Sequence, residues 1–283
     1  MTSIPPGPKC CSIRQYLNLH KALVVPCYLI FYFIFGQNLD SDQKDRFIEL
    51  SIMHGSYGIM WILKGNFDSY FLTALIGQKG IQVGAQDRPS SFRCFGGNPS
   101  CSIIPLKDIH FPDASWQAPA TLPSAIIGFI SMGIFYYLPG ISLTKPIGLD
   151  YFFIFESKSW QFAGWAVYIW GVFLHFVTDA EKYYILKYQV ERKLITEGMM
   201  EYSRNMNYFG EILIYLGFAF MSTSALPLIF SSFMWLTNFV PRMMMKDSSM
   251  SRHPEWEEWS KRAWILFPNP VIVIKNFPKW FSK

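Results

Sequence analysis

The sequence has few charged residues and few cysteines for its length. Only 16% of its 283 residues are charged, whereas 51% are hydrophobic and 18% are aromatic. This composition argues against an ordinary water-soluble domain, because a core of normal size would leave much of the apolar surface unburied. We therefore expect lipid to cover the remainder. The 5 cysteines are an odd set, which excludes a fully paired disulfide framework, and we expect free thiols.

Several common motifs are also absent. No Gly-x-Gly-x-x-Gly occurs, which counts against a Rossmann dehydrogenase. The spacing of Cys94 and Cys101 fits no common zinc pattern, so we expect no metal site. The opening MTSIPPGPKCCSIRQ has prolines and two cysteines where a cleavable signal peptide needs an apolar core, so the first apolar run is expected to be the insertion signal. The basic residues are spread along the chain, which favours membrane orientation over nucleic-acid binding.

Apolar runs long enough, or nearly so, to cross about 30 Å of hydrocarbon recur along the chain. They lie at residues 22–36, 47–63, 121–140, 160–178, 207–223 and 225–240. The sequence therefore predicts an all-α, multi-pass transmembrane helix bundle of about six spans, which forms a single membrane domain over residues 1–283. Residues 65–110 are rich in Gly, Pro and Ser and are predicted to be an extramembrane insertion. Residues 179–201 are predicted to form a helix along the membrane surface.

The basic residues predict an orientation for these spans. Threaded in order, the spans leave 21 of the 25 Lys and Arg on one side, which receives residues 1–21, 64–120, 179–206 and 241–283. By the positive-inside rule that side is cytoplasmic or matrix, and both termini lie on it. The last of these segments, 241–283, is expected to be an amphipathic tail on the basic side. The endoplasmic reticulum and the inner mitochondrial membrane satisfy the same rule, so the organelle stays open.

Three of the predicted spans carry a polar stripe near their basic-side ends. Ionisable groups in membranes normally face a bundle interior or a wet cavity, so we expect one shared polar pocket. The alternative is that these side chains are interhelical hydrogen-bond partners with no chemistry. His20 is expected to be solvated in a loop. The stripes are His54, Tyr57, Trp61 and Lys64; Tyr168, His175, Asp179 and Lys182; and Arg204, Tyr208, Glu211 and Tyr215, with Asn207 one turn before Glu211.

The block HFVTDAEKYYILKYQVERKLITEGMMEYSRNMNYFGEILIYLGFAFMS resembles the C-terminal domain of the steroid 5-alpha-reductase family. The signature of that family is a glycine-aromatic turn followed by Pro-Asn-Tyr-Phe-Gly-Glu at the start of a membrane helix. The stretches HGSYGIMWILK and FPDASW are similar to segments that precede this domain in uncharacterised eukaryotic members. We take residues 111–283 as the reductase-like C-terminal region. One position departs from the pattern, because Met206 stands where the family commonly has proline.

The resemblance implies an NADPH-dependent oxidoreductase of the endoplasmic reticulum. Its reaction would reduce a carbon–carbon double bond conjugated to a ketone in a steroid or other lipid. Hydride must reach the beta carbon while an acid stabilises the enolate oxygen, and the polar face of the second span offers Tyr57 or His54 as that acid. The residues that the resemblance and the third stripe offer for cofactor binding are Asp179, Arg204, Asn207, Tyr208, Glu211 and Arg242.

Two other functions stay open. Met206 leaves the backbone before Asn207 less constrained than proline would. Together with the insertion at 65–110, it raises the hypothesis of a catalytically retired family member that serves as an accessory subunit of a large membrane complex, such as a mitochondrial respiratory complex. The insertion would then bind other subunits. Isoprenylcysteine carboxyl methyltransferases share a related fold, so an S-adenosylmethionine-dependent methyltransferase is the third hypothesis. In each case membrane lipids surround the chain, and the enzyme hypotheses add a lipid substrate.

Overall fold

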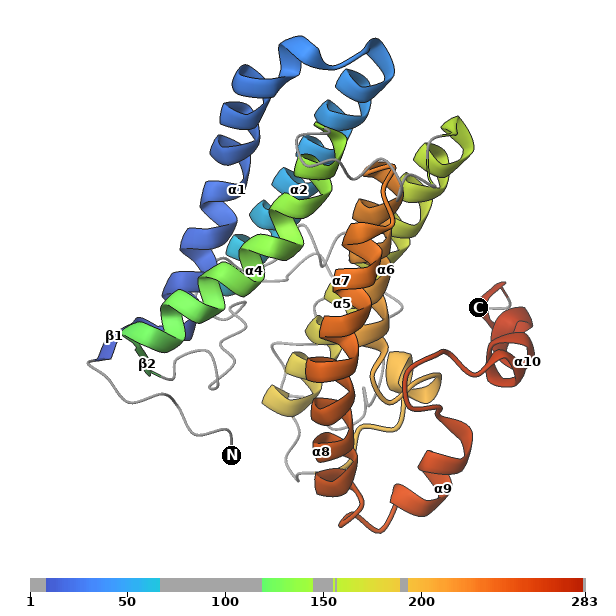
Figure 1. Ribbon diagram of the computed structural model, residues 1–283. Coiled ribbons are helices and arrows are strands. Elements are labelled where there is room, and N and C mark those ends of the chain that lie inside the picture. The colour runs from blue at the N-terminus through green and yellow to red at the C-terminus, as the bar shows by residue number, and fades with distance from the viewer. Residues whose placement is uncertain (1–8, 67–118, 145–154, 156, 189–192, 282–283) are drawn as a thin grey trace, which may run out of the picture. The chain divides into compact units, whose positions relative to one another are not determined.

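The computed structural model describes residues 9–66, 119–144, 155, 157–188 and 193–281 (Figure 1). These residues are mostly helical, in agreement with the predicted all-α class. Two short strands, β1 (Lys9–Ser12) and β2 (Pro119–Thr121), pair antiparallel and were not foreseen. Nearly all of the insertion predicted at 65–110 lies outside the described residues. Its predicted binding to other subunits therefore stays a prediction.

The chain divides into two compact units. The first consists of residues 1–68, 109–169 and 214–233, and the second of residues 69–108, 170–213 and 234–283. Three helices, Lys158–Tyr188, Met206–Met221 and Leu226–Met234, have residues in both units. The predicted single membrane domain over residues 1–283 stays a prediction.

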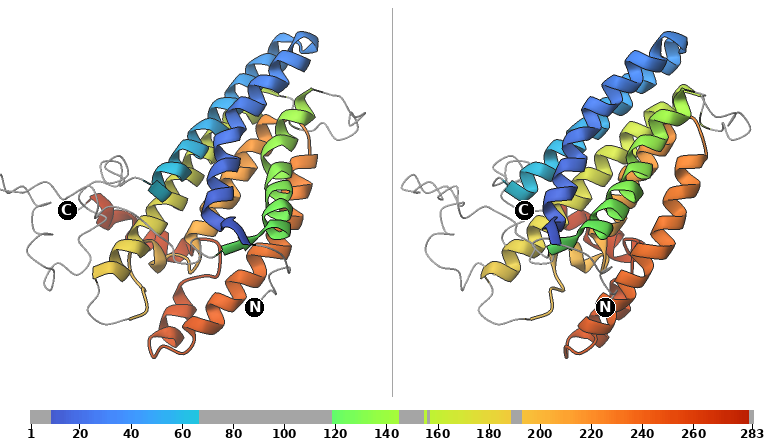
Figure 2. Two further views of the ribbon diagram at one scale, coloured as in Figure 1. Left: turned by 90° about the vertical axis from the view of Figure 1, so that its left-hand side faces the viewer. Right: turned by 60° about the vertical axis from the view of Figure 1, so that its left-hand side comes forward.

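The first unit contains a helical hairpin with a third helix packed on it. Helix α1 (Ile13–Phe35) ends in the 3-10 turn η1 (Gly36–Asn38), and α2 (Ser41–Asn66) returns alongside it. Helix α4 (Leu122–Leu143) packs on both, as the views in Figures 1 and 2 agree. The backbones of α1 and α2 come close where a β-carbon on Gly58 would lie 3.1 Å from the Lys21 carbonyl oxygen. Small residues permit such approach between membrane helices.

A buried arginine connects the start of α2 to the residues just before α5 (Lys158–Tyr188). The Arg46 side chain is fully buried, and its Nε donates to Asp42 Oδ2 at 2.9 Å. Its two terminal nitrogens donate to the carbonyl oxygens of Phe155 at 3.2 Å and Ser157 at 2.9 Å. Lys158 forms a second ion pair with Asp42. A buried charge needs partners of this kind. Arg46 therefore fixes where helix α5 begins.

The remaining helices come from the C-terminal region. Helix α5 is continuous from Lys158 to Tyr188. Residues 179–188 are therefore helical, as predicted, but they continue the preceding helix and do not start a separate surface helix. The π-helical turn η7 (Trp235–Phe239) ends two residues before Pro241, which cannot donate to the carbonyl one turn back. The other elements are η6 (Gly198–Glu201), α6 (Met206–Met221), α7 (Leu226–Met234), η7 (Trp235–Phe239), α8 (Val240–Met250), α9 (Trp256–Arg262) and α10 (Pro270–Phe281).

Three helices are long and apolar enough to cross a membrane, among the residues searched. They are Leu19–Asn38, Leu122–Leu143 and Lys158–Leu186, and Met206–Met221 is a shorter apolar helix. The chain therefore has the character of a membrane protein. The other predicted spans, 47–63 and 225–240, also fall on helices, but the count of six stays a prediction.

The position of His20 corrects the sequence analysis. Helix α1 begins at Ile13, well before the apolar run at 22–36, so His20 lies in a helix and not in a loop. Its side chain is fully buried and is not solvated. Local hydropathy missed this part of the helix because its polar residues are covered by α2 and α4, which come later in the sequence. Cys27, on the same helix, is a free thiol.

Candidate functional site

The two proposed acids lie on α2 in the first unit. His54 and Tyr57 are 1% and 0% exposed. The His54 ring stacks on Phe218 with a centroid distance of 3.7 Å, and the Tyr57 ring lies 4.2 Å from the Lys21 ammonium nitrogen. These two members of the stripe predicted on α2 are therefore buried inside this unit, with neighbours that the spacing along one helix does not reveal.

The second unit brings α5 and α6 together at two glycines. A β-carbon on Gly210 would lie 2.5 Å from the His175 backbone nitrogen and 2.8 Å from the Gly171 carbonyl oxygen, so only glycine fits this crossing. Next to it, His175 Nδ1 lies 3.1 Å from the Asn207 carbonyl oxygen, and its Nε2 lies 3.8 Å from Asp179 Oδ2. The carbonyl can only accept, so His175 Nδ1 carries the hydrogen.

Four of the six predicted cofactor-binding residues share one electrostatic neighbourhood in this unit. The Tyr208 side chain hydrogen-bonds with Arg242, and the charges of Glu211 and Asp179 act on the same hydroxyl. The Phe239 ring packs on Tyr208 with a centroid distance of 4.8 Å. These side chains come from α5, α6 and α8, so the fold, and not sequence proximity, assembles them.

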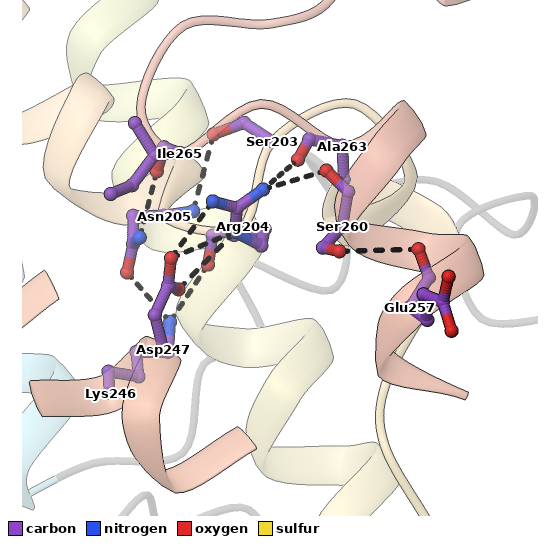
Figure 3. Close-up of polar contacts among 9 residues, drawn as sticks. All are labelled: Ser203, Arg204, Asn205, Lys246, Asp247, Glu257, Ser260, Ala263 and Ile265. Carbon is purple, nitrogen blue, oxygen red and sulfur yellow. Dashed lines mark hydrogen bonds and ion pairs between the residues drawn. The ribbon is translucent and has the colours of Figure 1, made fainter. Parts of the chain in front are cut away.

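Arg204 binds the C-terminal tail within the second unit (Figure 3). Its Nη2 donates to Asp247 Oδ2 at 2.9 Å, and its Nε lies within 3.3 Å of both carboxylate oxygens. Its Nη1 donates to the carbonyl oxygens of Ser260, at 3.1 Å, and Ala263. The guanidinium carbon also lies 5.3 Å from the ring centroid of Trp256. Every guanidinium nitrogen thus has a protein partner, which suits Arg204 to positioning the chain.

Lys246 holds the same turn from α8 (Figure 3). Its Nζ donates to the Arg204 carbonyl oxygen at 2.9 Å and to Asn205 Oδ1 at 3.0 Å. Asn205 Nδ2 in turn donates to the Ile265 carbonyl oxygen at 2.8 Å. Burial lowers the pKa of Lys246 to about 8, and the charge of Lys182 acts in the same direction. The turn that opens α6 is therefore fixed by contacts from α8 and from the chain after α9.

Asn207 presents a buried oxygen next to this fixed turn. Its Oδ1 has no hydrogen-bond partner among the described residues. Leaving a buried acceptor unpaired costs about 1–3 kcal/mol, and a ligand that donates a hydrogen bond removes this cost. Arg242 is exposed on α8, and a guanidinium suits a phosphate. The residues of this neighbourhood therefore fit a dinucleotide, which has both donor groups and phosphates.

Sequence reasoning missed Lys246, Asp247, His20 and Lys21. Lys246 and Asp247 belong to the segment taken as an amphipathic tail, where charges are ordinarily solvated. Their pairing with Arg204 and Asn205 depends on a return of the chain over about 40 positions, which no local pattern encodes. His20 and Lys21 precede the apolar run at 22–36, so the sequence predicts a solvated position for His20 and gives no sign of its burial.

Residues 125–262 match the family model described as "Protein of unknown function (DUF1295)". The matched segment covers slightly less than half of the chain. No curated protein and no solved structure matches the chain. All six predicted cofactor-binding residues lie inside the matched segment, whereas His54 and Tyr57 lie before it.

Proposed function

We propose that the chain is an integral-membrane, NADPH-dependent reductase of a carbon–carbon double bond conjugated to a ketone in a lipid. The observation that carries the proposal is the buried Asn207 oxygen without a partner among the described residues, on a helix whose first turn is fixed by Arg204 and Lys246. The resemblance of the block HFVTDAEKYYILKYQVERKLITEGMMEYSRNMNYFGEILIYLGFAFMS to the steroid 5-alpha-reductase family supports it, and this block lies inside the segment that matches DUF1295.

The residues of the second unit have distinct roles in this proposal. Asn207 accepts a hydrogen bond from the cofactor, and Arg242 pairs with a phosphate. Tyr208 hydrogen-bonds with that arginine and orients it, and the charges of Glu211 and Asp179 act on the Tyr208 hydroxyl. Arg204 acts as a positioning residue through its contacts with Asp247 and the tail. When bound, the cofactor supplies hydride.

The residues of the first unit serve the oxygen of the substrate. Delivery of hydride to the beta carbon moves negative charge to the ketone oxygen, and a positioned donor stabilises that charge most strongly where water is excluded. His54 and Tyr57 are both buried and carry exchangeable protons. We assign this donor role to Tyr57, because the hydrogen of His54 Nδ1 faces the Leu50 carbonyl oxygen. The proposal further places the protein in the endoplasmic reticulum, with both termini on the cytoplasmic side.

Transfer of isotope from cofactor to product tests the proposal. Purified protein in lipid nanodiscs is supplied with NADPH that carries deuterium at the transferable position and with a panel of steroid and straight-chain enones. We expect one deuterium at the beta carbon of a saturated ketone, with a rate reduced by about a hundred-fold in Asn207→Ala. The matched control is Asn238→Ala, whose side chain contacts only Met234 and Thr237 among the described residues.

Two results would count against the reductase. One is a saturated product without deuterium, which would show that the hydride comes from elsewhere. The other is equal turnover in Asn207→Ala and wild type, which would remove the Asn207 oxygen from the cofactor site.

A further inference from the structure

We infer that His20, Lys21 and His54 form a binding site for a single ketone or hydroxyl oxygen at the end of a lipid. We call these three residues the oxygen site. The inference rests on the proposed function, because the lipid is the substrate proposed above, and it adds His20 and Lys21 to the residues that recognise it. All three residues belong to the first unit.

Lys21 is a buried cation on a helix with membrane-spanning character. It is 3% exposed, and it lies within the apolar segment Leu19–Asn38. Its Nζ lies 3.8 Å from the ring centroid of Tyr136 and 4.2 Å from that of Tyr57. Aromatic faces stabilise an ammonium through cation–π interactions. A cation in such a segment is expensive and is normally functional, and the rings fix the place where it acts.

The His54 ring lies near the same cluster, 5.7 Å from Tyr136 between centroids. Its Nδ1 lies 2.9 Å from the Leu50 carbonyl oxygen, which can only accept, so Nδ1 carries the hydrogen. In the neutral ring Nε2 is therefore an acceptor. That nitrogen is buried and has no hydrogen-bond partner among the described residues. The stacked Phe218 ring limits rotation of the imidazole, so Nε2 is held in position for a donor.

His20 adds two more buried nitrogens without partners. Its side chain is 0% exposed, and neither Nδ1 nor Nε2 has a hydrogen-bond partner in the part of the chain that the structure describes. Its ring is surrounded by aromatic rings, with centroids at 4.9 Å for Phe129 and 5.1 Å for Tyr136. Each buried polar group without a partner costs about 1–3 kcal/mol. Without a ligand, the folded protein bears this free-energy cost. A bound polar atom that pairs with the His20 nitrogens would remove it.

Tyr136 brings the oxygen site together. The same ring lies 3.8 Å from Lys21 Nζ, and its centroid lies 5.1 Å and 5.7 Å from the rings of His20 and His54. Tyr136 is 1% exposed, and its hydroxyl lies 3.2 Å from the Tyr215 hydroxyl. Donors and acceptors of α1 and α2 thus meet around one aromatic residue of α4.

The chemistry of this set favours a neutral oxygen. The Lys21 ammonium donates to a ketone oxygen, and the neutral imidazoles accept from a hydroxyl or an enol. Three aromatic rings lie near the ammonium and stabilise its charge. The apolar rings around the histidines suit the body of a lipid and exclude water.

Binding measured without NADPH tests the oxygen site. Protein in nanodiscs is titrated with four probes of one chain length: 2-hexadecanone, 1-hexadecanol, hexadecanoic acid and hexadecane. We expect saturable binding of the ketone and the alcohol, at least about ten-fold tighter than that of the hydrocarbon. His20→Phe and His54→Phe should each weaken binding of the alcohol by about ten-fold. The control is His253→Phe, a change at a half-buried histidine of the second unit.

A second measurement covers the case in which a variant does not fold. In wild-type protein with nitrogen-15-labelled histidine, the alcohol should shift the His54 Nε2 resonance, whereas hexadecane should not. Equal binding of all four probes, binding of the acid alone, or unaltered binding in both phenylalanine variants would overturn the inference. Because no NADPH is present, these failures are separate from a failure of deuterium transfer, which concerns the proposed reductase.

Discussion

The Arg204 guanidinium binds other residues of the protein. The sequence predicts a cofactor-binding residue, so Arg204 has a different role from the one that the sequence predicts. Sequence analysis placed it in a polar stripe with Tyr208 and Glu211. The structure gives it a carboxylate and two carbonyl oxygens as partners. A bidentate arginine is a rigid connector as well as a charge. Its contribution to the proposed site is therefore to hold the turn from which Asn207 projects.

Lys246 gives the free energy of unfolding a defined dependence on pH. Its pKa falls from the ordinary value of 10.5 to about 8 in the folded chain, because the ammonium is buried and lies near Lys182. The unfolded chain therefore binds this proton more tightly, so this residue makes stability rise between pH 8 and 10.5 and removes that gain as the pH falls through 8. The surrounding charges are Asp179, Asp247, Arg204 and Lys182.

We predict that Lys246→Met makes this rise smaller. Unfolding free energies measured in detergent across this pH range should climb less steeply in the variant than in wild type, because methionine does not titrate. The control is Lys261→Met, since Lys261 is exposed and pairs with Glu257 on its own helix. An identical slope in Lys246→Met and wild type would contradict the assignment.

Residue-level prediction from the sequence succeeded where all the information lay on one helix. The spacing of His54 and Tyr57 correctly indicated a shared face, and both are buried. The neighbours of these residues could not be predicted, because Lys21 and Tyr136 come from other helices. Whether His54 and Tyr57 donate protons stays a prediction.

At the scale of elements, the crossing of α5 and α6 depends on Gly210. A methyl group there would overlap the backbone of α5, which cannot move aside as a flexible side chain can. We predict that Gly210→Ala destabilises the protein by about 1–3 kcal/mol and weakens NADPH binding. Thermal unfolding and cofactor titration of the purified variant check both effects.

The control for this substitution is another helical glycine with room for a methyl group. At Gly133 the nearest atom to an added β-carbon is 3.5 Å away, on the flexible side chain of Tyr137. Gly133→Ala should change stability by less than about 0.5 kcal/mol. If both variants behave alike, the close approach of α5 and α6 is not what Gly210 provides.

The start of α6 at Met206 also bears on the hypothesis of a catalytically retired enzyme. Met206 was taken as a loss of backbone constraint before Asn207. In the structure Met206 is 2% exposed, and the preceding turn is held by Lys246 and by the pair of Arg204 with Asp247. These contacts provide a constraint that proline would otherwise give. The substitution is therefore compatible with a fixed site.

Helix existence was easier to predict than helix limits. Each predicted span falls on a helix, because long apolar runs dominate the local signal. The limits failed where polar residues continue a helix, at the start of α1 and at the end of α5. Tertiary packing satisfies those residues, and packing is not visible in a local window.

For the whole molecule, the distribution of basic residues predicts the topology. An even number of spans places both termini on the same face, and the segment 37–46 lies on the other. Epitope tags at the two termini should both react from the cytoplasmic side of intact vesicles. A tag inserted between Leu39 and Asp40 should react only after the membrane is opened. Terminal tags on opposite faces would require an odd number of spans and would contradict this arrangement.

The central claim is a dinucleotide site at Asn207, and direct binding tests it best. Gently extracted protein is titrated with NADPH and, in parallel, with S-adenosylmethionine, in wild type, Asn207→Ala and Asn238→Ala, while the size of the protein particle is recorded. We predict NADPH binding that Asn207→Ala weakens by at least about ten-fold and that Asn238→Ala leaves unchanged. Binding of S-adenosylmethionine in place of NADPH, or no binding by a chain embedded in a large complex, would contradict the claim.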